Sequence, residues 1–132
     1  MKKILNSLLL LISTFLLVAC QEVTSMTPQE PMWNKEPCSR CRMVLSEKRF
    51  AVQRILNNGE IHFYDDMNCA LGHGHHQDDG KLYVRPFGGE SWVPAEEVKY
   101  VGGLRTPMNS GYGAVLEGGN VTFQEIMQKF KE

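Results

Sequence analysis

The sequence has no excess of positive charge and no internal repeat. Its 14 lysines and arginines are outnumbered by 15 aspartates and glutamates, which gives a formal net charge of −1 at pH 7. Nucleic acids are bound chiefly through clusters of basic residues, so this composition argues against a nucleic-acid partner. The 132 residues are enough for one small domain with a modest hydrophobic core.

The chain also lacks an apolar run long enough to span a bilayer. The longest such run covers residues 4–18, which is shorter than the roughly 20 residues of a transmembrane helix. Because Lys2 and Lys3 precede it, residues 1–19 have the pattern of a secretory signal peptide that is removed on export.

Leu-Val-Ala-Cys at residues 17–20 spans the end of the signal peptide and resembles the bacterial lipobox. This resemblance implies cleavage before Cys20 and lipidation of its sulfur. We therefore expect an extracytoplasmic lipoprotein anchored to a membrane on the periplasmic side. Gln21 stands where an aspartate retains many lipoproteins in the inner membrane, so it favours the outer membrane.

Large apolar side chains are scarce in residues 22–36, which are rich in Thr, Ser, Gln, Glu and Pro. A segment of this composition buries too little apolar surface to fold alone. We therefore predict a flexible tether over residues 20–36 and a folded domain over residues 37–132.

The domain combines short strands with two helices. Alternating side chains predict strands over residues 50–56 and 60–64, joined at Asn58-Gly59, a strong hairpin signal. Asp65 or Asp66 is expected to cap a helix that ends near Gly72.

The second half of the domain repeats the mixture. Shorter strands are expected over residues 82–87, 91–93, 99–101 and 114–116, with a helical turn at 94–98 and a loop at 102–113. Thr122 and Glu125 form a capping box before an amphipathic helix that reaches Phe130. Without regular crossover helices, this order predicts an α+β fold of small antiparallel or mixed sheets with packed helices.

Only one Cys-x-x-Cys pair is present. Lipidation of Cys20 leaves Cys38, Cys41 and Cys69, an odd number that leaves at least one thiol without a partner in the chain. The spacing of Cys38 and Cys41 permits a disulfide, either structural or redox-active. No strand is expected before the pair, which argues against a thiol–disulfide oxidoreductase.

Two metals compete with the disulfide. A structural zinc site normally uses four nitrogen or sulfur ligands, often as two regularly spaced pairs. Cu(I) is soft and prefers thiolates and thioethers at low coordination number. Met43 places a thioether two residues after Cys41, which favours Cu(I), although a methionine also packs well in a core.

Several segments together resemble the NosL family of membrane-anchored copper-binding lipoproteins, which assist assembly of the copper centres of nitrous oxide reductase. They are Glu-Pro-Cys-Ser-Arg-Cys-Arg-Met at 36–43, Arg-Phe-Ala at 49–51, Ile-His-Phe-Tyr-Asp-Asp-Met-Asn-Cys-Ala-Leu at 61–71, Thr-Pro-Met at 106–108 and Gly-Tyr-Gly-Ala at 111–114. The segments cover nearly all of the expected domain, in order.

The resemblance implies a non-enzymatic Cu(I) metallochaperone that serves nitrous oxide reductase or its membrane maturation complex. It implies Cys38, Cys41, Met43 and Met108 as metal ligands, and two ββαβ-like halves related in shape to organomercury lyases. An organomercury lyase-like activity is a further alternative, suggested by that analogy alone. We expect Cys69 to be a buried structural thiol in preference to a metal ligand. We expect Asp65 and Asp66 to be helix caps.

One departure from the family pattern follows Leu71. The apolar helix is cut short by glycines, and His73, His75 and His76 form a His-x-His-His cluster. Imidazole suits copper, zinc and nickel, so the cluster is either an additional metal site or a solvated histidine-rich loop.

Overall fold

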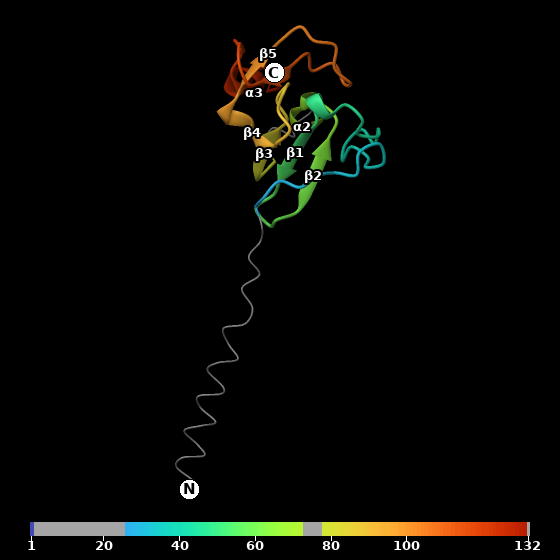
Figure 1. The fold of residues 1–132 in the computed structure, drawn as a ribbon, viewed down its shortest axis with the longest axis vertical. Coiled ribbons are helices and arrows are strands. Elements are labelled where there is room, and N and C mark those ends of the chain that lie inside the picture. Colours follow the sequence, from blue (N-terminus) through green and yellow to red (C-terminus); the bar gives the residue numbers. More distant parts are fainter. Residues whose placement is uncertain (2–25, 73–77, 132) are drawn as a thin grey trace.

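The α+β prediction is confirmed by a computed structural model that describes residues 1, 26–72 and 78–131 (Figure 1). Four antiparallel strands form a sheet in the order β2-β1-β3-β4, and β5 pairs with β6 in a second, two-stranded sheet. The strands are β1 (Val52–Ile55), β2 (Ile61–Tyr64), β3 (Lys81–Val84), β4 (Val93–Pro94), β5 (Lys99–Val101) and β6 (Gly113–Val115).

Helical elements cover and connect the sheets. The α-helices are α2 (Met67–Leu71) and α3 (Phe123–Lys129), and the 3-10 turns are η2 (Lys48–Phe50) and η4 (Ala95–Glu97). The first half follows the expected ββαβ order. The second half differs from it, because no strand follows α3 in the part of the chain that the structure describes. No helix in these residues is long and apolar enough to cross a membrane.

The hairpin of β1 and β2 forms where the sequence predicts it. Residues 57–59 connect the strands, since the Leu56 backbone N–H donates to the Glu60 carbonyl at 2.8 Å. Gly59 has a φ of 86°, a left-handed conformation that glycine adopts without steric cost. The first strand is shorter than expected because residues 48–50 form the turn η2.

Strand β1 is buried on both faces. All four of its residues are buried, and its two polar side chains bind segments that cover the sheet. On one face Arg54 Nη2 donates to the carbonyl of Ala70, at the end of α2, at 2.9 Å. On the other face, Gln53 pairs in both directions with the backbone of Gln29, at 2.8 Å each.

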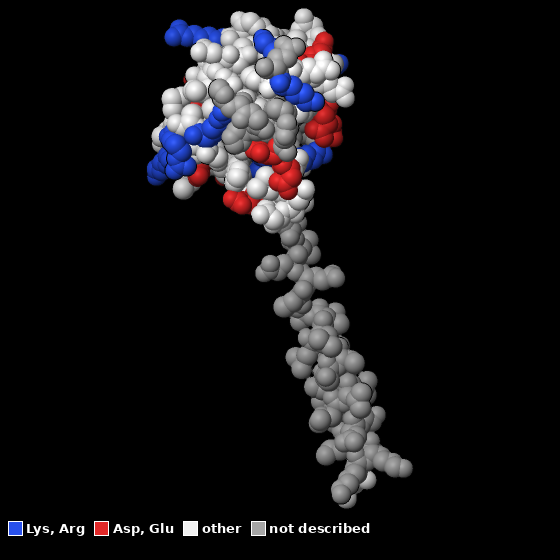
Figure 2. Space-filling model, turned by 180° about the vertical axis from the view of Figure 1, so that it is seen from behind, with Lys and Arg blue, Asp and Glu red and all other residues white. Residues whose placement is uncertain are grey.

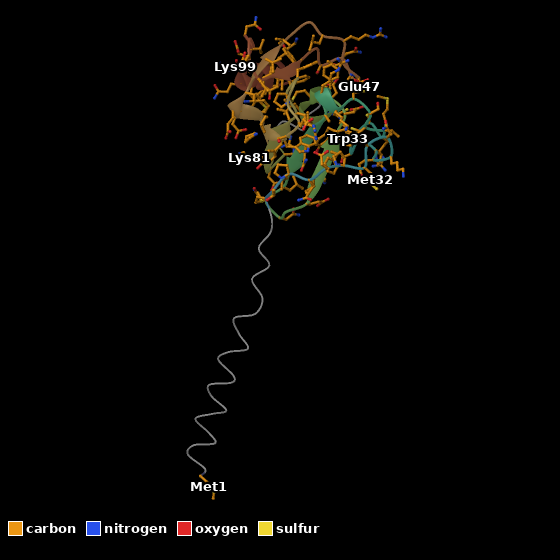
Figure 3. The ribbon with its side chains drawn as sticks, viewed as in Figure 1. Met1, Met32, Trp33, Glu47, Lys81 and Lys99 are labelled. Carbon is orange, nitrogen blue, oxygen red and sulfur yellow. The ribbon has the colours of Figure 1, made fainter. Side chains whose placement is uncertain are left out.

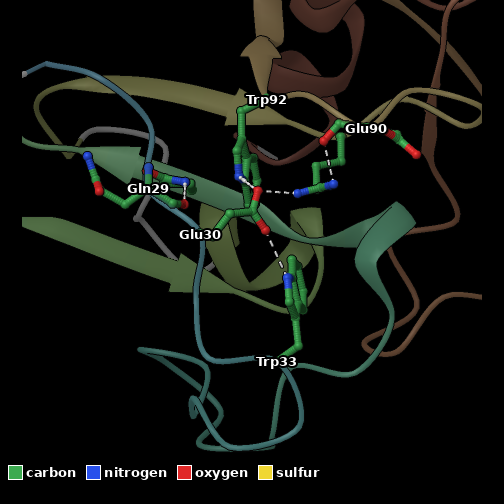
Figure 4. A network of polar contacts seen from close by, with 7 residues as sticks. Gln29, Glu30, Trp33, Glu90 and Trp92 are labelled. Carbon is green, nitrogen blue, oxygen red and sulfur yellow. Dashed lines mark hydrogen bonds and ion pairs between the residues drawn. The ribbon is translucent and has the colours of Figure 1, made fainter.

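The last residues of the expected tether are held against the domain. Glu30 accepts hydrogen bonds from the indole N–H groups of Trp33 and Trp92, each at 2.9 Å, and forms an ion pair with Arg85 (Figure 4). Together with the Gln29–Gln53 pair, these contacts attach residues 29–33 to the four-stranded sheet. The composition of this segment predicts flexibility, but these contacts with the domain fix its position.

Helix α3 begins as the capping box predicts. Thr122 Oγ1 accepts from the Glu125 N–H at 3.2 Å, and Glu125 Oε2 accepts from the Thr122 N–H at 2.6 Å. Ile126 is fully buried, and the other apolar residues of the same stripe pack partly against the core. They are Phe123, Met127 and Phe130.

Replacing Gln53 should loosen the segment that it holds. Gln53→Ala removes both bonds to Gln29 and leaves a small void at a fully buried position, so we expect a loss of about 2 kcal/mol in the free energy of unfolding. Chemical denaturation measures this loss, and amide hydrogen exchange should rise at residues 29–33. Gln128→Ala, at an exposed position of α3, is the matched control. Equal effects of the two substitutions would contradict the structural role of Gln53.

Candidate metal centre

A tight hairpin carries Cys38 and Cys41. The Cys38 N–H donates to the Met43 carbonyl at 2.7 Å, and the Leu45 N–H donates to the Glu36 carbonyl at 2.9 Å. Within the loop the Arg42 N–H donates to the Cys38 carbonyl at 3.1 Å. Arg42 has a φ of 66°, an uncommon conformation for a residue with a side chain. We call residues 35–49, with this loop at their centre, the cysteine hairpin.

The other half of the site comes from the end of β2 and from α2. Asp66 is the N-cap of α2, because its Oδ1 accepts from the Asn68 N–H at 2.9 Å. Cys69 lies in the middle of the helix, with 3% of its surface exposed. Asp65, directly before the cap, makes no such bond to the helix.

Four side chains meet between the hairpin and α2. The sulfur atoms of Cys38, Cys41 and Cys69 and a carboxylate oxygen of Asp65 all lie within 4.8 Å of one another. Cys38 is completely buried, and Cys41 is the one partly exposed member. This sulfur-rich cluster has the donor atoms and the compactness of a metal-binding site.

The cluster departs from two expectations. Asp65 was expected to be a helix cap, but Asp66 alone takes that role and Asp65 joins the cluster. Cys69 is buried as expected, yet its sulfur faces the other two thiols and is positioned as a ligand. Local sequence gives no signal for this role of Asp65, because Asp65 precedes the N-cap of α2 and meets Cys41 across 24 positions of the chain.

Asp65 contributes an incompletely satisfied group. Its Oδ2 accepts a hydrogen bond from the Cys41 thiol at 3.3 Å. Its Oδ1 is buried and has no hydrogen-bond partner among the described residues. Buried polar atoms are nearly always paired, so this oxygen points to a proton or a cation at the cluster. Burial and the nearby negative charge of Cys38 both raise the pKa of the Asp65 carboxyl.

Cys38 is the thiolate of the cluster. The Cys69 thiol donates a hydrogen bond to its sulfur, and the backbone N–H groups of Arg40, Asp65 and Cys41 do the same. These donors outweigh the opposing effect of burial and lower the pKa of Cys38 to about 4. The site therefore holds one preformed, hydrogen-bonded thiolate at neutral pH.

The other two thiols are held in the protonated form. Burial, together with the negative charge of Cys38, raises the pKa of Cys41 to about 11. The bond that Cys69 donates to Cys38, followed by burial, raises the pKa of Cys69. Because metals bind thiolates, occupancy by all three sulfurs would release two protons.

Arg40 fastens the cysteine hairpin to α2. Its Nη1 donates to the carbonyls of Asn68 at 3.3 Å and Cys69 at 3.5 Å, and also to the carbonyl of Gly72. These carbonyls lie at the C-terminal end of α2, where a cation interacts favourably with the helix dipole. Arg40 lies between Cys38 and Cys41, so the clamp sets the distance from those two thiols to Cys69.

The two methionines predicted as ligands have different surroundings. Met43 lies in the cysteine hairpin and is 45% exposed. Met108 is partly buried, and its backbone is fixed to α2: its N–H donates to Asp66 Oδ2 and its carbonyl accepts from Asn68 Nδ2, both at 2.8 Å. The Thr-Pro-Met loop is thus attached to the helix that carries Cys69.

Cys20, His73, His75 and His76 fall outside the described residues. His62 is described, and it contacts Glu60 and the hydroxyl of Tyr64.

Comparison of the chain with protein-family models, with curated proteins and with solved structures found no match. The resemblance to the NosL family therefore rests on the sequence segments given above, and the metal site rests on its own geometry.

Loss of the Arg40 clamp should weaken metal binding without removing a ligand. Arg40→Met separates the hairpin from the end of α2, and we expect the affinity for Cd²⁺, a spectroscopic probe of thiolate ligation, to fall about tenfold. Titration followed by thiolate-to-metal absorption measures the change. Arg40→Lys should retain part of the affinity that Arg40→Met loses. Arg42→Met, at an exposed position two residues away, should have little effect on the Cd²⁺ affinity. A similar loss for Arg42→Met would rule out a specific clamp.

The Cys38 thiolate should persist far into the acid range. In reduced, metal-free protein, the ultraviolet absorbance of one thiolate should disappear as the pH falls through about 4. Because folding lowers this pKa from roughly 8.5, the thiolate's contribution to stability is complete above that pH. It declines as the pH falls and is lost below about 4.

Cys69→Ala is the informative variant for this titration. It removes the hydrogen bond that lowers the pKa of Cys38 most, so the absorbance step should move to higher pH. A wild-type step near the ordinary cysteine value would show that the cluster holds no special thiolate.

Proposed function

We propose that this protein is a Cu(I) metallochaperone that holds the ion between the cysteine hairpin and α2 and passes it on by ligand exchange. The observation that carries the proposal is the gathering of three sulfur atoms within 4.8 Å of one another. Cu(I) prefers two or three soft ligands, so this set satisfies it without a further donor.

The carboxylate of Asp65 bears on the choice between Cu(I) and zinc. A tetrahedral zinc site would use Asp65 as an ionised fourth ligand. Burial and the negative charge of Cys38 raise the pKa of Asp65, so its ionisation is less favourable than that of an exposed aspartate. Cu(I) needs no carboxylate beside the three sulfurs, and the Met43 thioether in the same hairpin adds a further soft donor.

Partial exposure of the site suits transfer. Cys38 and Cys69 are buried, whereas Cys41 is partly exposed. An incoming ligand can therefore join the ion beside Cys41 while the two buried sulfurs still hold it. Protonation of Cys41, whose pKa is raised to about 11, would complete its release. The chemistry is an exchange of ligands, so the protein has no catalytic turnover.

The NosL-like segments suggest the destination of the metal. On that basis the acceptor is nitrous oxide reductase or its membrane maturation complex. A lipid on Cys20 would keep the protein on the periplasmic side of a membrane, where tethering raises the effective concentration of membrane-bound partners.

A thiol–disulfide oxidoreductase is the second candidate. The lowered pKa of Cys38 and the two thiols beside it would allow attack on a disulfide followed by resolution. The position of the pair argues against this function. Cys38 lies in a hairpin loop, not at the start of a helix as in redox-active Cys-x-x-Cys motifs.

Copper affinity should depend on sulfur at specific positions. Titration of reduced protein with Cu(I) against a competing chelator should show high affinity. Cys38→Ser and Cys69→Ser each remove a ligand, so they should weaken binding by more than the roughly 10–100-fold typical of a supporting residue. Met43→Leu should weaken Cu(I) binding by a smaller factor and leave Zn²⁺ binding unchanged.

Met127→Leu, in α3, is the matched control for Met43→Leu, because Met127 packs against the core. If zinc binds as tightly as Cu(I) and Met43→Leu changes neither affinity, the copper assignment is wrong. Insulin reduction by the same preparation tests the second candidate: sustained turnover that requires Cys38 would favour the oxidoreductase.

A further inference from the structure

The outer surface of the cysteine hairpin combines basic and soft apolar side chains. Three exposed basic residues belong to the hairpin, and three large apolar residues within it or just before it in the chain are 45–65% exposed. They are Lys35, Arg42 and Lys48, together with Met32, Met43 and Val44. We call these six residues the docking face. In Figure 3, Met32 and Trp33 lie on the side of the domain formed by this hairpin.

The charge of the hairpin is opposite to that of the rest of the protein. Residues 35–49 contain five basic and two acidic side chains, while the remaining chain contains nine basic and thirteen acidic ones. Figure 2 shows the molecule from behind, so the hairpin on the right of Figure 1 lies on the left there. Blue side chains gather on that side of the domain.

Much of this positive charge is available to an outside partner. Lys35 and Arg42 form no ion pair with any residue that the structure describes. Arg49 is paired with Glu47 at 3.4 Å, and Arg40 is directed to the end of α2. The exposed charge of the face therefore comes from Lys35, Arg42 and Lys48.

The docking face adjoins the open side of the metal cluster. Arg42 and Met43 directly follow Cys41, which is the one partly exposed member of the cluster. A ligand that takes the metal from the side of Cys41 therefore approaches next to these residues.

We propose that the docking face binds the protein that exchanges copper with the cluster, and that this partner carries an acidic rim around its own soft metal ligands. The inference rests on the proposed copper function. Complementary charges speed encounter and orient the partner, and the exposed methionines offer an adaptable, polarizable contact surface.

An anionic membrane is the main competing occupant, since basic and apolar side chains together also bind lipid surfaces. Lipid headgroups on this face would cover the approach to Cys41 and hinder transfer. An acidic protein partner uses the same charges and brings its ligands to the metal, so the position of Cys41 favours the protein.

Two defined acceptor peptides test this inference with the full chain. Both carry the same Cys-x-x-Cys ligands, one flanked by aspartates and the other by lysines. We expect Cu(I) transfer to the acidic peptide to be about tenfold faster at low salt, with the advantage shrinking as the salt concentration rises. Equal rates for the two peptides would overturn the proposal.

Charge reversal locates the effect on the protein. Lys35→Glu combined with Arg42→Glu should abolish the preference for the acidic peptide and leave Cu(I) affinity unchanged. Lys99→Glu combined with Lys131→Glu makes the same change in net charge at exposed positions outside the hairpin, and it should retain the preference. If both double variants lose it equally, net charge and not the docking face is responsible.

Direct binding separates docking from metal chemistry. The anisotropy of a fluorescent acidic peptide whose cysteines are replaced by serine reports binding to the metal-free protein, so a failure of the copper function would not affect it. No binding would overturn the docking proposal alone. The variant with Lys35→Glu and Arg42→Glu gives two further tests. If it binds the peptide normally but no longer binds phosphatidylserine vesicles, the face binds a membrane and the proposal is wrong. If it binds the peptide normally but no longer forms a dimer that the wild type forms at low salt, the face binds a second copy of the chain and the proposal is wrong.

Discussion

Helix α2 holds the site together, although it has only five residues and a helix this short is unstable alone. Contacts at both ends keep it in place. Asp66 binds the N–H groups of Asn68 and Met108 at its start. Arg40 and Arg54 bind carbonyls at its end. The positions of Asp65 and Cys69 therefore depend on a buried carboxylate and two guanidinium groups from other parts of the chain.

The same contacts explain the unequal state of the three thiols. The hairpin loop directs backbone N–H groups at Cys38, and α2 adds the Cys69 thiol as a further donor. One sulfur is thereby stabilised as a thiolate, and its charge raises the pKa of its neighbours. A soft cation entering this cluster meets a ready anion and two thiols that give up protons as they bind.

Local patterns in the sequence predict the parts of the fold that depend on neighbouring residues. The Asn58-Gly59 hairpin, the Thr122 capping box and the candidate ligands Cys38 and Cys41 are all visible at short spacing. The role of Asp65 is not visible at short spacing, because its contact with Cys41 joins residues 24 positions apart. Residues 29–33 have a disordered composition, yet buried Gln53 and the Glu30 network fix them on the sheet.

Separate structural requirements divide the cysteine hairpin into an inner and an outer side. Inward, Cys38 belongs to the cluster and Arg40 binds the C-terminal end of α2. Outward, the side chain of Arg42 is exposed and forms no ion pair with any described residue. The φ of 66° at Arg42 marks the change in chain direction between the two sides. Under the proposed function, changes to the Arg42 side chain would alter which partner docks while the cluster of Cys38, Cys41, Asp65 and Cys69 stays in place. The choice of partner and the affinity for metal would then vary independently.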